Sequence, residues 1–350
     1  MSETIKVGIL GAGRSGWNIH AQTLAEHPGF TVVALADAVA ERRAEAEQQL
    51  GCRTATDPRM VLDDDEVQLI VVATPSYTHV PLAIEALDAG RHVVVEKPMA
   101  RNVEEVDRMT AAAERAGRVL TIYQQRRFDP DYLAVRDLVE SGRLGELILV
   151  RRSIHGYARR ADWQMLRKFD GGALSNTAPH LIDQVLQLGM PEGGKYELLA
   201  DLRHTIGAGD AEDHVKMVVK PASGPLLEVE ASSCVALPQP EWLVAGTAGS
   251  VSGTSRGLTV RWCDPDSLPP LTVDEGPAVD RRYGTGEVIE WQEEEVDLAT
   301  ARETSRSASA QFYDRLASTL TDGGPPPVTP ASVRTQIELL NRSRDLTGFA

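Results

Sequence analysis

A glycine-rich turn near the start of the chain has the residue types that hold a dinucleotide. Gly11-Ala12-Gly13-Arg14-Ser15-Gly16 follows a short apolar run, Lys6–Leu10, and precedes a helical pattern. In this context Gly11 permits a tight turn, Gly13 lets a pyrophosphate approach the backbone, and Gly16 lets the helix pack against the strand. The pyrophosphate would lie on free N–H groups at the start of that helix. The motif therefore predicts a dinucleotide-binding site.

A second apolar run, Thr31–Ala36, ends in Asp37, about 20 residues after the last glycine of the turn. A carboxylate at that place accepts hydrogen bonds from an adenosine ribose. The alternative is that Asp37 only caps the next helix. Asp37 would repel the 2′-phosphate of NADP, and Ala38 follows it where an arginine would favour that phosphate. Arg42 and Arg43 lie about one helical turn further on, so NAD is favoured and NADP is not excluded.

Two more predicted strands are followed by residues that could act in binding or catalysis. Leu69–Ala73 is followed by Thr74-Pro75-Ser76-Tyr77-Thr78-His79, and Val93-Val94-Val95 is followed by Glu96-Lys97-Pro98. Both prolines are expected to end strands. A lysine directly after a buried strand either faces a cleft or forms a structural ion pair with Glu96 or an aspartate. The residues alone leave both alternatives open.

These strand ends need a parallel sheet to hold them side by side. Four short runs rich in Val and Ile alternate with helical patterns, which predicts βαβ units and a doubly wound α/β sheet. Ligands bind such a sheet beyond the carboxyl ends of its strands. The strands are Lys6–Leu10, Thr31–Ala36, Leu69–Ala73 and His92–Glu96, and the helices are Gly16–Glu26, Ala40–Leu50, Val80–Ala89 and Val103–Ala116.

The rest of the chain has a different pattern. After a helical segment at Asp131–Ser141, strands follow one another without regular helices between them. They cover Glu146–His155, Glu197–Thr205, His214–Lys220, Leu226–Ala231, Glu241–Gly246 and Leu258–Trp262, and helical patterns at Ser307–Leu320 and Ser332–Leu346 end the chain. A length of 350 residues suits two domains. We expect a nucleotide-binding domain over residues 1–122 and a substrate-binding and oligomerisation domain over residues 123–350.

Together these residues resemble the Gfo/Idh/MocA family of nicotinamide-dependent oxidoreductases, which act mainly on sugars and polyols. The match runs in order along nearly the whole chain, through Gly11–Gly16, Asp37, Thr74-Pro75 with His79, Glu96-Lys97-Pro98 and Gly171–Asp183. The resemblance implies a Rossmann domain followed by an α/β domain with a largely antiparallel open sheet. It also implies an NAD(P)-dependent enzyme acting on CH–OH groups. The resemblance assigns cofactor binding to Gly11, Ala12, Gly13, Arg14, Ser15, Gly16, Asp37, Thr74, Pro75, His79, Glu96 and Lys97.

The same resemblance assigns the catalytic roles to Lys97 and His180. His180 suits acid/base work because its ordinary pKa lies near neutrality, and Lys97 would stabilise charge on the reacting oxygen. The alternative for His180 is a residue of a helix N-terminus satisfied by backbone, since Pro179 precedes it. Many family members carry aspartate four residues before this histidine, where this chain has Asn176. Asparagine cannot ionise but can orient a substrate hydroxyl, so His180 or Lys97 is expected to be the sole acid/base.

Substrate contacts are expected from side chains on segments that should face the cleft. Arginine could clamp a carboxylate or phosphate, and an aromatic ring could cover the apolar face of a sugar. The alternative for the arginines is solvation or pairing with the excess acids. Asp183 follows His180 by three residues and could bind a hydroxyl or orient that histidine, and the pair is too sparse to predict a metal. The candidates are Arg126, Arg127, Tyr157, Trp163, Arg167, Asn176, His180 and Asp183.

Net charge, cysteine spacing and the length of apolar runs limit the binding partners and the cellular compartment that we expect. The net charge of −15 argues against nucleic acid and anionic membrane. The three cysteines are far apart, and no apolar run is long enough to span a bilayer, so we expect a cytoplasmic protein. An antiparallel sheet with one uncovered face is commonly hidden by subunit contact in this family. A homodimer or homotetramer formed through that sheet is therefore expected.

The sequence alone leaves three alternative functions open. The first is NAD(P)-dependent oxidation or reduction at a secondary hydroxyl or carbonyl of a sugar, polyol or sugar derivative. The second is an epimerase or glycosidase that holds NAD tightly and oxidises its sugar only transiently. The third is a non-catalytic regulator that senses the NAD redox state, which would need the glycine motif but not Lys97 and His180.

Overall fold

The computed structural model describes residues 4–191, 193–273, 275–276 and 287–349. The first part of the chain forms a six-stranded parallel sheet in the order β3-β2-β1-β4-β5-β6. Its strands are β1 (Ile5–Leu10), β2 (Phe30–Ala36), β3 (Arg53–Ala55), β4 (Leu69–Val72), β5 (His92–Glu96) and β6 (Leu120–Tyr123). Strand order reverses between β1 and β4, so the carboxyl ends of these two neighbours border a ligand-binding crevice.

Short helices connect the parallel strands. A π-helical turn over Arg14–Ala21 leads into α1 (Gln22–Glu26), where a single helix was predicted. The others are α2 (Ala40–Leu50), α3 (Arg59–Leu62), α4 (His79–Asp88) and α5 (Val103–Ala116). Val7, Ile9 and Leu10 of β1 and the apolar side chains of β4 and β5 are buried, as expected for parallel strands covered on both faces. The predicted doubly wound sheet is confirmed.

The second part of the chain forms an eight-stranded, mostly antiparallel sheet in the order β14-β13-β12-β11-β7-β10-β9-β8. Only the central β7–β10 pair is parallel among the described pairings. The strands are β7 (Leu147–His155), β8 (Tyr196–Arg203), β9 (His214–Pro221), β10 (Leu226–Ser232), β11 (Trp242–Gly246), β12 (Gly249–Thr254), β13 (Gly257–Trp262) and β14 (Gln292–Asp297). This confirms the expected second fold type.

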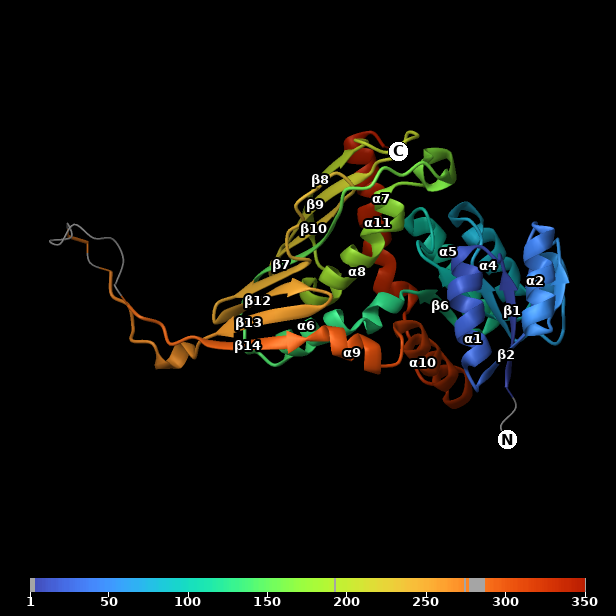
Figure 1. The fold of residues 1–350 in the computed structure, drawn as a ribbon, viewed down its shortest axis with the longest axis horizontal. Coiled ribbons are helices and arrows are strands. Elements are labelled where there is room, and N and C mark those ends of the chain that lie inside the picture. Colours follow the sequence, from blue (N-terminus) through green and yellow to red (C-terminus); the bar gives the residue numbers. More distant parts are fainter. Residues whose placement is uncertain (1–3, 192, 274, 277–286, 350) are drawn as a thin grey trace.

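Helices cover one face of this sheet. Figure 1 shows α6 (Pro130–Glu140), α8 (Ala178–Gly189) and α11 (Pro330–Thr347) between the second sheet and the parallel sheet. Helix α8 packs on β7 and β10, and α11 packs on β8. No described helix lies on the opposite face. None of the described helices combines the length and apolarity needed to cross a bilayer.

The last two helices return to the first sheet. α10 (Ala308–Asp322) contacts α1, and its Phe312 ring lies 4.9 Å from the ring of Tyr123 on β6. Just before α11, Val328 is buried and its carbonyl accepts a hydrogen bond from the Thr121 hydroxyl of β6. Helix α11 itself also contacts α5. The domain boundary at residues 122/123 stays a prediction, and these helices, which follow it in sequence, pack on elements that precede it.

Candidate active site

The glycine turn has the geometry that a dinucleotide requires. Gly11 has a φ of +91°, and a Cβ there would lie 2.8 Å from the carbonyl oxygen of Ala73. A Cβ on Gly16 would overlap the carbonyl oxygen of Gly11, so only glycine lets the helix start this close to β1. A Cβ on Gly13 would meet nothing within 4 Å. Of these three glycines, only Gly13 borders open space, and it is the position predicted to face the pyrophosphate.

Asp37 lies at the end of β2 beside this turn. Its Oδ2 accepts a hydrogen bond from the Ala12 N–H at 2.7 Å, and its Oδ1 accepts one from the Val39 N–H at 2.8 Å. Helix α2 begins only at Ala40, so the side chain forms a local turn rather than a helix cap. The guanidinium of Arg42 is 3.4 Å from Oδ2. Oδ2 thus accepts from both Ala12 and Arg42, whereas Oδ1 keeps a second lone pair that can accept from a ribose hydroxyl, so the residues present fit NAD.

The glycine turn yields a prediction that separates folding from cofactor binding. Gly13→Ala should keep the wild-type melting temperature but weaken NADH binding at least about tenfold, because its methyl group occupies only the pyrophosphate's space. Gly16→Ala should instead lower stability by about 1–3 kcal/mol, because its methyl group overlaps backbone. Fluorescence titration with NADH and thermal melts measure both effects. Gly324→Ala, also in open space, is the control, and unchanged NADH affinity in Gly13→Ala would contradict the site.

The His79 side chain contacts both of the loops that follow β4 and β5. Its Nδ1 lies 2.9 Å from the carbonyl oxygen of Pro98, and its Nε2 lies 2.9 Å from that of Thr74. The side chain is buried, and burial lowers its pKa. Both ring nitrogens therefore contact protein backbone, which gives His79 a positioning arrangement behind the predicted cofactor edge. Pro75 follows Thr74 and precedes a short 3₁₀ turn at Ser76–Thr78.

Glu96 also faces the protein interior. Its Oε1 is 3.2 Å from Nε2 of buried His20, whose Nδ1 is 2.6 Å from the Tyr313 hydroxyl of α10. Its Oε2 accepts the backbone N–H of Lys97 at 3.0 Å. Burial opposes ionisation of this carboxyl, but the hydrogen bond from His20 and the nearby positive charges outweigh it and lower the pKa of Glu96. Glu96 thus pairs with His20 and holds the backbone from which Lys97 projects.

Lys97 contacts the backbone of Asn176 and lies near His180. The Lys97 ammonium donates a hydrogen bond to the backbone carbonyl of Asn176 at 3.0 Å. Asn176 ends α7 (Ala173–Asn176), and His180 lies in the first turn of α8. The side-chain Nδ2 of Asn176 is buried and has no hydrogen-bond partner among the described residues. A buried donor without a partner is uncommon in proteins, which makes this amide a candidate to meet a substrate oxygen.

Burial and neighbouring cations depress the basicity of both titrating groups. Burial lowers the pKa of Lys97, and Arg126 and Arg14 lower it further against the opposite effect of Glu96. Burial lowers the pKa of His180 well below its ordinary value, with Lys97, Arg126 and Arg152 acting in the same direction. His180 is therefore a neutral imidazole at neutral pH and can accept a proton.

Several predicted substrate residues are engaged elsewhere. Asp183 forms a two-pronged ion pair with Arg127, at 2.8 Å and 2.6 Å, so it does not orient His180. Tyr157 and Trp163 are 64% and 49% exposed, and the Trp163 ring packs edge-on against Phe169. The backbone N–H of Arg167 bonds to Asp210, and its guanidinium lies over the Phe349 ring. These side chains meet Lys97 and His180 in none of the described contacts.

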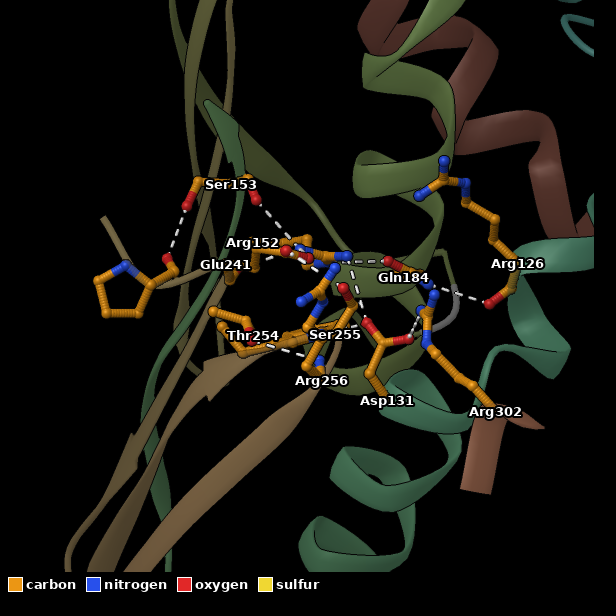
Figure 2. A network of polar contacts seen from close by, with 12 residues as sticks. Arg126, Asp131, Arg152, Ser153, Gln184, Glu241, Thr254, Ser255, Arg256 and Arg302 are labelled. Carbon is orange, nitrogen blue, oxygen red and sulfur yellow. Dashed lines mark hydrogen bonds and ion pairs between the residues drawn. The ribbon is translucent and has the colours of Figure 1, made fainter. Parts of the chain in front are cut away.

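Arg126 lines a cavity of about 750 Å³ between the end of β6 and the second sheet. Figure 2 shows its guanidinium pointing away from the neighbouring ion pairs of Asp131 with Arg152 and Arg302. Asp129 lines the same cavity, where burial and the charge of Asp131 raise its pKa to about 6. Unlike Arg127, Arg126 remains available to a ligand.

Sequence analysis missed Gln124. Its side chain is completely buried, and its Oε1 lies 2.6 Å from Nδ1 of His180. The signal was its place at the carboxyl end of β6, next to the strand that delivers Lys97. Spacing alone could not connect it to a histidine 56 residues away.

Comparison with known proteins shows which family the chain belongs to. A model described as "Oxidoreductase family, NAD-binding Rossmann fold" matches residues 5–124, and the GFO/IDH/MocA C-terminal domain model matches residues 132–252. Two curated relatives are "Uncharacterized oxidoreductase YdgJ" from Escherichia coli, 34% identical over 196 residues, and "scyllo-inositol 2-dehydrogenase (NADP(+)) IolW" from Bacillus subtilis, 31% identical over 202 residues. The alignments cover 55% and 57% of this chain and 56% of each relative.

A solved structure shares the whole fold. The WlbA dehydrogenase from Bordetella pertussis, in complex with NADH and UDP-GlcNAcA, superposes with a TM-score of 0.78 at 23% identity. The superposition covers 99% of this chain and 97% of that one.

Proposed function

The chain belongs to the Gfo/Idh/MocA oxidoreductase family, and from that premise we propose an NAD-dependent dehydrogenase or reductase of a sugar, polyol or sugar derivative. The observation that carries this proposal is that the Lys97 ammonium, bonded to the backbone carbonyl of Asn176, lies near enough to His180 to lower the pKa of that imidazole. A redox sensor would need the glycine turn but no such pair. Inositol and sugar dehydrogenases among the relatives support the substrate class.

Each residue of this group has a distinct proposed task. Bound NAD would supply the hydride acceptor for a secondary alcohol. The Lys97 ammonium stabilises negative charge that develops on the reacting oxygen, in a buried place where such stabilisation is strong. Neutral His180 takes the hydroxyl proton, and the Asn176 amide donates a hydrogen bond to a substrate oxygen. Glu96 and His20 keep the lysine backbone in place.

We propose NAD rather than NADP as the cofactor. The Asp37 carboxylate would meet the 2′-phosphate of NADP, and both of its oxygens already hold backbone N–H groups, so it is fixed in place. Arg42 lies beside that carboxylate and partly offsets its charge, which leaves NADP as the weaker alternative.

The test is NADH formation by purified protein across a panel of inositols, aldoses, glycosides, sugar acids and nucleotide sugars, with NADP in parallel. A substrate whose turnover is lost in Lys97→Ala would support both the substrate class and the lysine's role. Copurified NAD with sugar conversion but no net NADH would instead indicate transient oxidation. NADH binding without conversion of any panel sugar would weigh against a sugar dehydrogenase.

Arg126 is expected to affect substrate affinity rather than chemistry. Arg126 lines the cavity described above and its charge lowers the pKa of both Lys97 and His180, so its guanidinium would bind a carboxylate, phosphate or hydroxyl of the substrate. Arg126→Gln should raise KM about 10- to 100-fold with kcat within about threefold, as the loss of about 1.5–3 kcal/mol of a charged hydrogen bond requires. Arg143→Gln, on an exposed ion pair with Glu294, is the matched control. An unchanged KM would remove Arg126 from the substrate site.

We also propose a cytoplasmic homodimer or homotetramer formed through the open face of the second sheet (Figure 1). Leu199 is exposed there, and Lys216, Glu228 and Glu230 form ion pairs across β9 and β10. Light scattering should give a multiple of the 38.0 kDa chain mass. Leu199→Glu should shift the mass toward one chain, and a monomeric mass for the unaltered protein would contradict the proposal.

A further inference from the structure

A neutral imidazole carries its single proton on one of two nitrogens, and only the other can accept a proton. In His180 that choice decides whether the side chain is a base toward substrate. Its Nδ1 is 2.6 Å from Oε1 of Gln124. The direction of this hydrogen bond follows from how the glutamine amide is oriented.

The amide of Gln124 has a second contact that orients it. Its Nε2 donates to the backbone carbonyl of Pro179 at 3.3 Å. A carbonyl oxygen only accepts hydrogen bonds, so the NH₂ group of the amide must face Pro179 and its oxygen must face His180. The same carbonyl accepts the amide of Gln336 on α11. Since Gln124 is completely buried, water does not compete for either contact.

We propose that Gln124 is a positioning residue that fixes the proton of His180 on Nδ1 and leaves Nε2 as the base. Because Oε1 can only accept, Nδ1 must donate, and the remaining nitrogen keeps its lone pair. The proton that an alcohol loses on oxidation then passes to Nε2 and makes His180 an imidazolium. That catalytic consequence rests on the proposed function, whereas the position of the proton does not.

An uncharged hydrogen-bond partner is consistent with the charged groups that surround His180. Three cations approach it from separate elements: Lys97 after β5, Arg126 after β6 and Arg152 on β7. On its own helix, the nearby Asp183 is bound by Arg127. A carboxylate in place of Gln124 would favour the imidazolium, while the amide holds the ring without adding negative charge. The imidazole is thus oriented and kept neutral.

The direct test is long-range ¹H–¹⁵N correlation NMR on protein labelled with ¹⁵N-histidine at neutral pH, with the His180 signals assigned from His180→Gln. We expect a protonated Nδ1 and an unprotonated Nε2. A protonated Nε2 or an imidazolium in the wild-type protein would overturn the proposal, whether or not a substrate is known. In Gln124→Met the signals should shift toward the Nε2-protonated form.

Steady-state kinetics with any substrate that the proposed sugar panel identifies give a second readout. Gln124→Met should lower kcat about 10- to 100-fold with KM within about threefold, as is typical when the partner that orients an imidazole is removed. Gln336→Met loses a bond to the same Pro179 carbonyl without touching His180, and should keep wild-type kcat. Gln124→Glu should move the acid limb of the kcat profile upward by about 1–3 pH units. Equal losses in the Gln124→Met and Gln336→Met variants, or an unmoved profile in Gln124→Glu, would reduce Gln124 to a packing role.

Discussion

Lys97→Ala is expected to lower kcat about a hundred- to a thousandfold while the protein still binds NADH. Lys97 follows β5, and its ammonium bonds to the Asn176 carbonyl and lies near enough to His180 to lower the pKa of that imidazole. Removing one preorganised donor from a buried oxyanion site typically costs this much. Steady-state NADH formation measures the loss, and fluorescence titration measures cofactor binding. Lys97→Met, which keeps most of the side-chain volume, should lose as much activity, because the charge and not the packing is responsible.

The matched control is Lys220→Ala, a change at a lysine on β9 that is exposed to solvent. It should keep wild-type kcat. Two results would count against the assignment of Lys97: kcat within about threefold of wild type, or a loss of activity fully explained by lost NADH binding. The second result would place the lysine with the cofactor instead of the reacting oxygen.

The second large effect concerns stability. Asp131→Ala should lower the free energy of unfolding by about 3–5 kcal/mol, because it removes the buried countercharge of Arg152, whose other carboxylate partner, Glu241, is partly exposed. Asp131 is 0% exposed and accepts hydrogen bonds from Arg152 at 3.3 Å, from the Trp242 indole at 2.9 Å and from Arg302 at 3.0 Å. Figure 2 shows this carboxylate between the two guanidinium groups. Urea denaturation at neutral pH measures the change.

Asp137→Ala is the control on the same helix, since Asp137 forms only an exposed pair with Arg136. Its effect should stay within about 1 kcal/mol. Replacing both members of the buried pair, in Asp131→Leu with Arg152→Met, should recover much of the lost stability. A loss below about 1 kcal/mol in Asp131→Ala would show that Glu241 alone satisfies Arg152.

Four strands of the parallel sheet were predictable because they are apolar runs followed by residues suited to binding or catalysis, whereas the edge strands β3 and β6 were not predicted. Much of the second sheet also appeared in the residue pattern, but β12 and β14 did not. Strand β12 consists of small and polar residues with two glycines, and β14 is largely glutamate. Both become strands because neighbours pair with them along their length, which is a tertiary effect that local composition does not carry.

The candidate site was predictable in its backbone and less so in its side-chain partners. Lys97 follows β5, Asn176 ends α7 and His180 lies in the first turn of α8, and Lys97 contacts the Asn176 carbonyl. Spacing could not show that Asp183 turns to Arg127, or that Gln124 turns to His180. Those pairings depend on rotamers and on contacts between elements far apart in sequence. Their roles stay predictions until the variants are measured.

The return of α10 to the first sheet has a consequence for biosynthesis. Tyr313 and Phe312 complete the buried cluster around His20 and Tyr123, so part of the nucleotide-binding core comes from the last part of the chain. A ribosome makes this segment after every strand of both sheets. The parallel sheet therefore cannot reach its final packing until this later segment has been made. Until then, Tyr123 of β6 lacks the aromatic neighbours that cover it in the folded protein.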